Sequence, residues 1–134
     1  VSELKASIHE AGLNDEIVFT DHRTDMREIY AISTLVLAVS NKAESFGRTA
    51  LEPLCIGTPT VGFDLGGVGE ILATLFPAGR VPNQDSQALC DTVAELLTAP
   101  APPIAPNTEF LLNNMCEHTL QTYAELVSEG ATQP

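Results

Sequence analysis

Short apolar runs alternate with helical segments along most of this chain. The runs at residues 17–20, 35–39 and 60–63 consist mainly of apolar and β-branched residues, as buried strands do. Residues 79–82 predict a weaker fourth strand at a sheet edge, because Pro82 lacks a backbone donor. The alternation predicts an α/β fold in which a parallel sheet of about four strands carries helices on both faces.

Helical spacing of apolar residues fills the intervals between these runs. Gly12 is a typical helix stop, Thr24 or Asp25 can cap a second helix, and Asp85 can cap another. Four prolines at 99–106 predict a semi-rigid crossover to a C-terminal helix, and we expect residues 1–134 to form a single domain. The predicted helices are 2–12, 24–32, 46–56, 68–75, 86–97 and 107–129.

Charge and apolar content exclude several functions. The 134 residues include 18 acidic and 6 basic ones, and the net charge of −12 argues against nucleic-acid binding because it repels phosphate backbones. No apolar run approaches the roughly 20 residues that cross a bilayer, so we expect no transmembrane segment. We expect a cytoplasmic protein, and peripheral attachment of a parent enzyme to the inner face of the membrane stays open.

The three cysteines are odd in number and widely spaced. Cys55, Cys90 and Cys116 each lie in apolar, predicted helical sequence, which favours reduced structural thiols. Neither metal-ligand spacing nor a His pair accompanies them, so we expect no metal.

Two carboxylates, Glu44 and Glu52, lie eight positions apart across a loop that enters a predicted helix. Ser45 and Gly47 lie at the turn, where the absence of a Cβ at the glycine lets backbone approach a ligand closely. The first N–H groups of the following helix have no partner within it and form a natural phosphate site. Glu44 would face the group attached to the phosphate, and Glu52 could accept hydrogen bonds from a vicinal diol such as ribose. The pattern suits a sugar nucleotide.

Three loops reinforce this interpretation. Residues 21–23, 40–47 and 64–70 each follow a predicted strand and precede a helix. In a parallel sheet such loops meet at the carboxyl ends of the strands, where ligands bind.

Three motifs occur in order at the spacing of a known family. They are Glu44, Ser45, Phe46, Gly47 and Glu52; then Gly57, Pro59 and Val61; then Gly66, Gly67 and Glu70. The chain thereby resembles the C-terminal, nucleotide-sugar-binding domain of the family 4 (group 1) glycosyltransferases, which have the glycosyltransferase-B fold. The resemblance covers nearly the whole chain and implies a Rossmann-like domain.

The resemblance also implies roles for individual residues. Glu44 is the implied catalytic residue and contacts the donor hexose, while Glu52 holds the ribose hydroxyls. The implied sugar- and diphosphate-binding residues are Ser45, Phe46, Gly47, Arg48 and Thr49. The loop flanking the base would contain Thr20, Asp21, His22 and Arg23. Such enzymes transfer a hexose from a nucleoside diphosphate with retention of configuration and without a metal or other cofactor.

Several departures from the family pattern have consequences. The resemblance implies that the first two strands of the domain, their basic clamp on the diphosphate and the N-terminal acceptor domain precede the residues given, so the chain alone should be inactive. Asp21 replaces a usual glycine, and Pro53 lies inside a helix. Arg48 replaces an aliphatic residue and could supply positive charge. We predict a repaired sheet, through direct pairing of residues 17–20 with 35–39 or through exchange in a homodimer.

Other interpretations stay open. The chain could be a non-catalytic nucleotide-sugar-binding or protein-interaction module, or an enzyme such as a sugar-nucleotide epimerase. A dinucleotide oxidoreductase is less favoured because the glycine-rich fingerprint is absent. Glu44 and Glu52 could also be solvated charges near a helix dipole.

Overall fold

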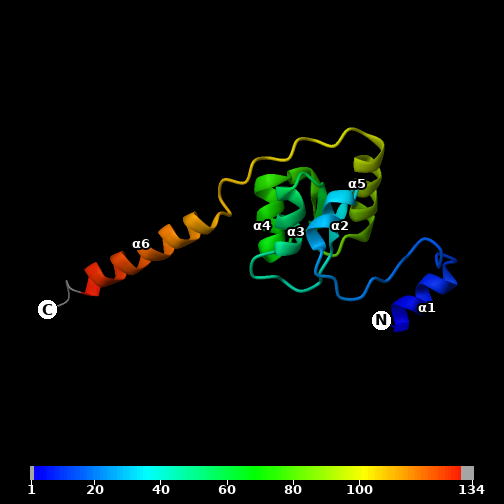
Figure 1. Cartoon of the computed structure of the whole chain (residues 1–134), viewed down its shortest axis with the longest axis horizontal. Coiled ribbons are helices and arrows are strands. Elements are labelled where there is room, and N and C mark those ends of the chain that lie inside the picture. Colours follow the sequence, from blue (N-terminus) through cyan, green and yellow to red (C-terminus); the bar gives the residue numbers. More distant parts are fainter. Residues whose placement is uncertain (1, 131–134) are drawn as a thin grey trace.

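The computed structural model describes residues 2–130, so residues 1 and 131–134 of the predicted domain lie outside the described part. A small α/β body lies between two helices that extend away from it, one near each end of the chain (Figure 1). The elements are α1 (Ser2–Glu10), α2 (Met26–Ile32), β1 (Val36–Ala38), α3 (Arg48–Cys55), β2 (Thr60–Phe63), α4 (Gly66–Leu75), the 3₁₀ turn η1 (Pro77–Gly79), β3 (Arg80–Val81), α5 (Ser86–Thr98) and α6 (Leu112–Gly130).

The sheet is parallel and open, with strand order β1-β2-β3. Residues alternate between its faces: Ala38 packs with α3 and α4, whereas Val61 and Phe63 pack beneath α5. The largest fully buried side chains include Phe76 and Ile71, on the α4 side. The predicted parallel α/β fold with helices on both faces is confirmed, with three strands among the described residues.

The predicted first strand, residues 17–20, is wrong. This segment is irregular, and Val18 is 80% exposed. Phe19 lies instead beneath the Lys5 ammonium, 5.1 Å from the ring centroid, so the segment associates with α1. A strand needs a neighbour for its backbone groups, and no strand of the described residues pairs with this segment. Direct repair of the sheet therefore does not occur within the described chain; exchange between chains stays a prediction.

Helix boundaries shift where glycine or asparagine controls the backbone. The helix predicted at 46–56 begins at Arg48, because Gly47 is its left-handed N-cap with φ 86°. The last helix begins at Leu112 instead of 107, since the Asn107 Oδ1 accepts a 2.9 Å hydrogen bond from the amide of Phe110 and closes a turn there. As predicted, Asp85 caps α5, accepting from the amide of Ala88 at 2.9 Å.

The extended segment before α6 returns along the body, and the amide of Ala105 donates to the carbonyl of Leu75 at 2.8 Å. Beyond it, α6 leaves its apolar side chains exposed, among them Leu112, Tyr123 and Val127. All three cysteines are free, as predicted, but they are exposed, so the predicted structural role of these thiols is wrong. Within residues 2–130, no helix combines the length and apolarity needed to cross a membrane.

Candidate functional site

The loop between β1 and α3 rests directly on the first turn of α4. A Cβ at Gly47 would lie 2.7 Å from the amide nitrogen of Val68, and one at Gly67 would lie 2.3 Å from the carbonyl of Phe46. The amide of Gly67 also donates a 2.8 Å hydrogen bond to the carbonyl of Glu44. Two of the sequence motifs are therefore in contact, and glycine is required where their backbones meet.

Two helix N-termini meet at this edge of the sheet. Among the described residues, no group accepts a hydrogen bond from the amides of Arg48 and Thr49, the first two of α3. The N-cap of α4, Leu65, provides no side-chain cap. Both helices thus direct the positive ends of their dipoles to one place, which favours an anion.

The two carboxylates flank the start of α3. Glu44 is half-buried, and its Oε2 lies 3.3 Å from the hydroxyl of Thr49. Glu52, one turn inside, accepts from the Arg48 guanidinium, whose Nε and Nη2 lie 2.8 and 2.6 Å from the same oxygen, Oε1. The second oxygen of Glu52, Oε2, has no described partner. The Thr49 hydroxyl also lies 3.5 Å from Glu44 Oε1, so among the described carboxylate oxygens at the helix start Glu52 Oε2 is the one left for a ligand.

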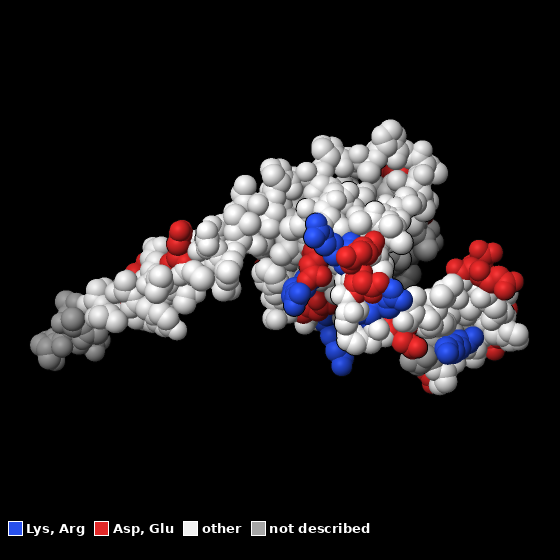
Figure 2. All heavy atoms as spheres, viewed as in Figure 1, with Lys and Arg blue, Asp and Glu red and all other residues white. Residues whose placement is uncertain are grey.

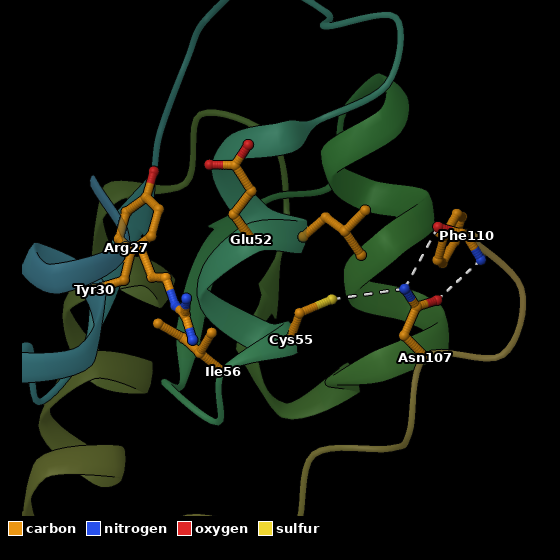
Figure 3. Close-up of a pocket in the computed structure, with 8 residues that line it drawn as sticks. Arg27, Tyr30, Glu52, Cys55, Ile56, Asn107 and Phe110 are labelled. Atoms are coloured by element: carbon orange, nitrogen blue, oxygen red, sulfur yellow. Dashed lines mark hydrogen bonds between the residues drawn. The ribbon is translucent and has the colours of Figure 1, made fainter. Parts of the chain in front are cut away.

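A cavity of about 390 Å³ opens beside Glu52, between α2, α3 and residues 107–110. Its wall is largely apolar, and Figure 3 shows the Glu52 carboxylate and the Tyr30 hydroxyl directed toward the same side of it. The side-chain amide of Asn107 links residues 107–110 to α3: it donates to the carbonyl of Phe110 at 3.4 Å and to Cys55 Sγ at 3.6 Å. The lining residues are Arg27, Tyr30, Leu51, Glu52, Cys55, Ile56, Asn107 and Phe110.

Tyr30 is the most buried polar side chain of this wall, at 8% exposure. Burial raises the pKa of the Tyr30 hydroxyl, because it disfavours the phenolate; the negative charge of Glu52 raises it further, and Arg48 partly offsets this. The carbonyl of Tyr30 accepts a 2.8 Å hydrogen bond from the buried hydroxyl of Thr58, which fixes α2 to the body.

The residues predicted to flank a base do not line this cavity. Thr20, Asp21, His22 and Arg23 are exposed, and none lines the cavity. Arg23 forms an ion pair with Asp25; the guanidinium, mainly through its hydrogen bond, holds the pKa of that carboxyl below its usual range. Sequence reasoning did not identify Arg27 and Tyr30 as site residues. The sequence indicates them only through their position on a predicted helix, which precedes the strand before the Glu44 loop.

Charge is distributed unevenly. Four of the six basic residues lie between positions 23 and 48, and residues 21–48 contain four acidic residues as well, so this segment is neutral in a chain of net charge −12. Figure 2 shows these charges intermixed on the face that α2 and α3 form, while α6 carries no Lys or Arg. The net charge of the chain therefore does not concentrate on this segment, which lowers its repulsion of an anion. In the described part of the chain, no group of three acidic, His or Cys residues is arranged to hold a metal ion.

Comparisons with known proteins place the chain among proteins of one family. The family model for glycosyl transferases group 1 matches residues 1–108. A lipopolysaccharide core biosynthesis mannosyltransferase, LpcC, of Rhizobium leguminosarum bv. viciae is 30% identical over 125 residues, which are 93% of this chain and 35% of that protein. A 2-deoxystreptamine glucosyltransferase of Streptomyces kanamyceticus is 34% identical over 106 residues, 78% of this chain and 27% of that protein.

A D-inositol 3-phosphate glycosyltransferase of Mycolicibacterium smegmatis is 32% identical over 90 residues, 66% of this chain and 20% of that protein. The chain thus spans between 20% and 35% of the length of these relatives.

Proposed function

Because this chain belongs to the group 1 glycosyltransferases, we propose that it forms the part of such an enzyme that binds the nucleoside diphosphate sugar donor. The resemblance carried by the three motifs is confirmed by the family match. We propose three further points: that the ligand is a sugar donor, that individual residues have the roles given below, and that the configuration of the sugar is retained.

The observation that carries the proposal is the contact between the Glu44–Gly47 loop and the first turn of α4. The Gly67 amide holds the Glu44 carbonyl at 2.8 Å, and the close approach at Gly47 brings the start of α3 beside that of α4. The amides of Arg48 and Thr49 are thereby left for the diphosphate, between one carboxylate at the loop and another a turn inside the helix.

In this arrangement each group has one task. Glu44 contacts the donor hexose, with the exposed Ser45 and Phe46 beside it. Glu52 accepts hydrogen bonds from the ribose diol through its unpartnered Oε2. Negative charge that develops on the departing diphosphate is stabilised by the two helix N-termini and by Arg48, without a metal. We propose that the hexose is transferred with retention, and that the acceptor site lies on another part of the enzyme.

The acceptor is not specified by the relatives, whose names include lipopolysaccharide core, 2-deoxystreptamine and inositol phosphate products or substrates. One observation favours the alternative of a non-catalytic protein-interaction module that binds no nucleotide sugar. Arg48 already engages one oxygen of Glu52, as in an ordinary surface i,i+4 ion pair. Such a pair competes with ribose for the carboxylate unless a bound diphosphate draws Arg48 away.

The test is a titration of the chain with a panel of nucleoside diphosphate sugars, followed by backbone amide shifts and calorimetry. We expect shifts at Gly47 to Glu52. Glu44→Gln should weaken binding of the sugar nucleotide about tenfold, or ~1.4 kcal/mol, but leave the nucleoside diphosphate unaffected. Glu52→Gln should weaken both, but not a 2′,3′-dideoxy analogue.

Glu95→Gln is the matched control, because Glu95 is an exposed carboxylate on α5, on the other face of the sheet. If no nucleoside diphosphate sugar of the panel shifts the amide signals of Gly47 to Glu52, the proposal of donor binding is wrong. An effect of Glu44→Gln on the sugar-free nucleotide would instead remove the role assigned to that carboxylate.

A further inference from the structure

We propose that Phe110 is a positioning residue for the donor site: its ring supports the side chain of Phe46 and thereby the start of α3. Phe110 acts through Phe46 and is assigned no contact with the donor. The inference rests on the proposed function and goes beyond it, because Phe110 lies outside residues 1–108, which the family model matches.

The rings of Phe46 and Phe110 contact each other edge to face. Their centroids are 6.3 Å apart, and their planes cross at 79°. In such a pair the positive edge of one ring meets the negative face of the other, which adds to the gain from apolar burial. Phe46 is 46% exposed, so the core does not enclose its ring, and the contact with Phe110 restricts the movement of that ring.

Phe110 is itself held in place by Asn107. The amide of Phe110 donates to Asn107 Oδ1 at 2.9 Å, and its carbonyl accepts from Asn107 Nδ2 at 3.4 Å. The same Nδ2 donates to Cys55 Sγ at 3.6 Å, which connects this turn to the last residue of α3 (Figure 3). The half-buried ring of Phe110 also packs against the main core. Phe110 is therefore a fixed support for a ring that lies on a loop.

The main chain of the loop has a second support, on α4. A Cβ at Gly67 would lie 2.3 Å from the carbonyl of Phe46, so the two backbones are in contact there. Phe46 directly precedes Gly47, the N-cap of α3. The first amides of α3, which we assign to the diphosphate, follow the position of this loop. The loop is thus fixed through its main chain by α4 and through its aromatic side chain by Phe110.

Two cavities border Phe110. Phe110 lines the cavity beside Glu52, and together with Phe46 it lines a second cavity of about 400 Å³. Because a protein relaxes only partly around a deleted side chain, loss of the Phe110 ring should enlarge this space and leave Phe46 without its support. One substitution should therefore free the loop without removing a group that touches the donor.

Inorganic pyrophosphate is the probe for this role, because it lacks both sugar and nucleoside and depends on the amides at the start of α3. Its Kd is measured from the amide shifts of Gly47 to Thr49 in the chain and in its variants. Phe110→Leu keeps an apolar side chain on the core but removes the ring, and it should raise the Kd about fivefold. Phe110→Tyr keeps the ring, so its Kd should stay within about twofold of that of the unsubstituted chain.

Ile104→Ala separates positioning from packing. Ile104 lies in the segment that leads to Phe110 and packs against the same core, but it lines neither cavity beside Phe110. The substitution should lower the midpoint of urea denaturation more than Phe110→Leu does, because it deletes more of a packed side chain. The Kd of pyrophosphate should nevertheless stay within about twofold of that of the unsubstituted chain.

A double-mutant cycle tests the route through Phe46. Phe46→Leu should weaken pyrophosphate binding as much as Phe110→Leu does, since either substitution breaks the ring contact. The double variant should then bind no more weakly than either single variant. Effects that multiply in the double variant would overturn the inference, because the two residues would act independently.

The remaining outcomes separate the two proposals. An unchanged Kd in Phe110→Leu would overturn the inference and leave donor binding intact. An equal rise of the Kd in Ile104→Ala would also overturn it, because loss of core packing would then be enough to weaken the site. Shifts with a nucleoside diphosphate sugar but none with pyrophosphate would overturn it as well, since the start of α3 would not be what binds phosphate. If neither probe shifts the amides of Gly47 to Glu52, the proposed function and the inference are both wrong.

Discussion

The amide of Gly67 donates a 2.8 Å hydrogen bond to the carbonyl oxygen of Glu44, and this bond joins the first turn of α4 to the loop that precedes α3. The contact fixes the backbone of the first carboxylate of the motif. It does so through main-chain atoms, so the geometry depends on the absence of side chains at the glycines and only weakly on the identity of their neighbours.

Gly67→Ala should damage this contact. Its Cβ would lie 2.3 Å from the carbonyl carbon and oxygen of Phe46, so the loop must shift. We expect a loss of about 1–3 kcal/mol in the free energy of unfolding, measured by urea denaturation. Donor binding should be lost in the protein that remains folded.

Gly57→Ala is the control for this substitution. Gly57 has φ 88°, but a Cβ there meets no atom within 4 Å, so only the left-handed backbone resists it, at about 1–2 kcal/mol. Donor affinity should be retained. Equal affinity in the Gly67→Ala and Gly57→Ala variants would show that the loop contact does not shape the site.

Thr58→Val should loosen α2. The buried Thr58 hydroxyl donates to the carbonyl of Tyr30, which also accepts from the amide of Ser33, so the carbonyl keeps one partner. We expect a loss of about 1 kcal/mol in unfolding free energy. Thr74→Val, which removes an exposed hydrogen bond to Glu70 within α4, should change stability by less than about 0.5 kcal/mol. Matching losses in the two variants would contradict the role of Thr58.

Tyr30 should titrate late in a spectrophotometric titration of the two tyrosines, because burial and then Glu52 raise its pKa above the ordinary value of 10.0. Tyr30→Phe should remove the late phase. Glu52→Gln should move it to lower pH, since one negative charge no longer disfavours the phenolate. Persistence of the late phase in Tyr30→Phe would contradict the assignment.

The raised pKa of Tyr30 also affects the stability of the fold at high pH. The unfolded chain releases the Tyr30 proton near pH 10, before the folded chain does. The stabilising contribution is therefore complete below pH 10 and is lost as the pH rises through the folded pKa. Denaturation curves of Tyr30→Phe should fall less steeply with pH in that range than those of the unsubstituted chain.

The outer edge of β1 should support association between chains. Within residues 2–130, β2 is the one strand that pairs with β1, and Leu37 on β1 is 49% exposed. Unpaired edges of this kind associate, so sedimentation velocity should show concentration-dependent dimers. Leu37→Lys should shift the population toward monomer, whereas Leu97→Lys on α5 should not. A monomer at every concentration would refute exchange between chains.

Much of the fold could be predicted from local pattern. The strands at β1 and β2 are short apolar runs between glycines or polar loops, and α5 begins at a side-chain cap that the sequence displays. The meeting of the Glu44 loop with Gly67 follows from topology, because consecutive parallel strands direct their following loops to one edge.

The cavity could not be predicted in this way. Its far wall exists because the crossover segment returns to α3, bringing Asn107 to Cys55 and placing the rings of Phe46 and Phe110 6.3 Å apart. These contacts join residues more than fifty positions apart in sequence, which no local periodicity reports. The strand prediction at residues 17–20 is wrong for the same reason. The apolar pattern of these residues is typical of a strand, but strand formation also depends on a neighbouring strand that pairs with it.

The separation of α1 and α6 from the body determines what unfolds as a unit. The last side chains packed on the main core are Ile104 and Phe110, and α6 lies beyond them with its apolar face in solvent. Amide hydrogens of α6 should therefore exchange with solvent through local fraying. Those of β2 should exchange only through global unfolding. Calorimetry should accordingly report an enthalpy that belongs to fewer residues than the chain contains.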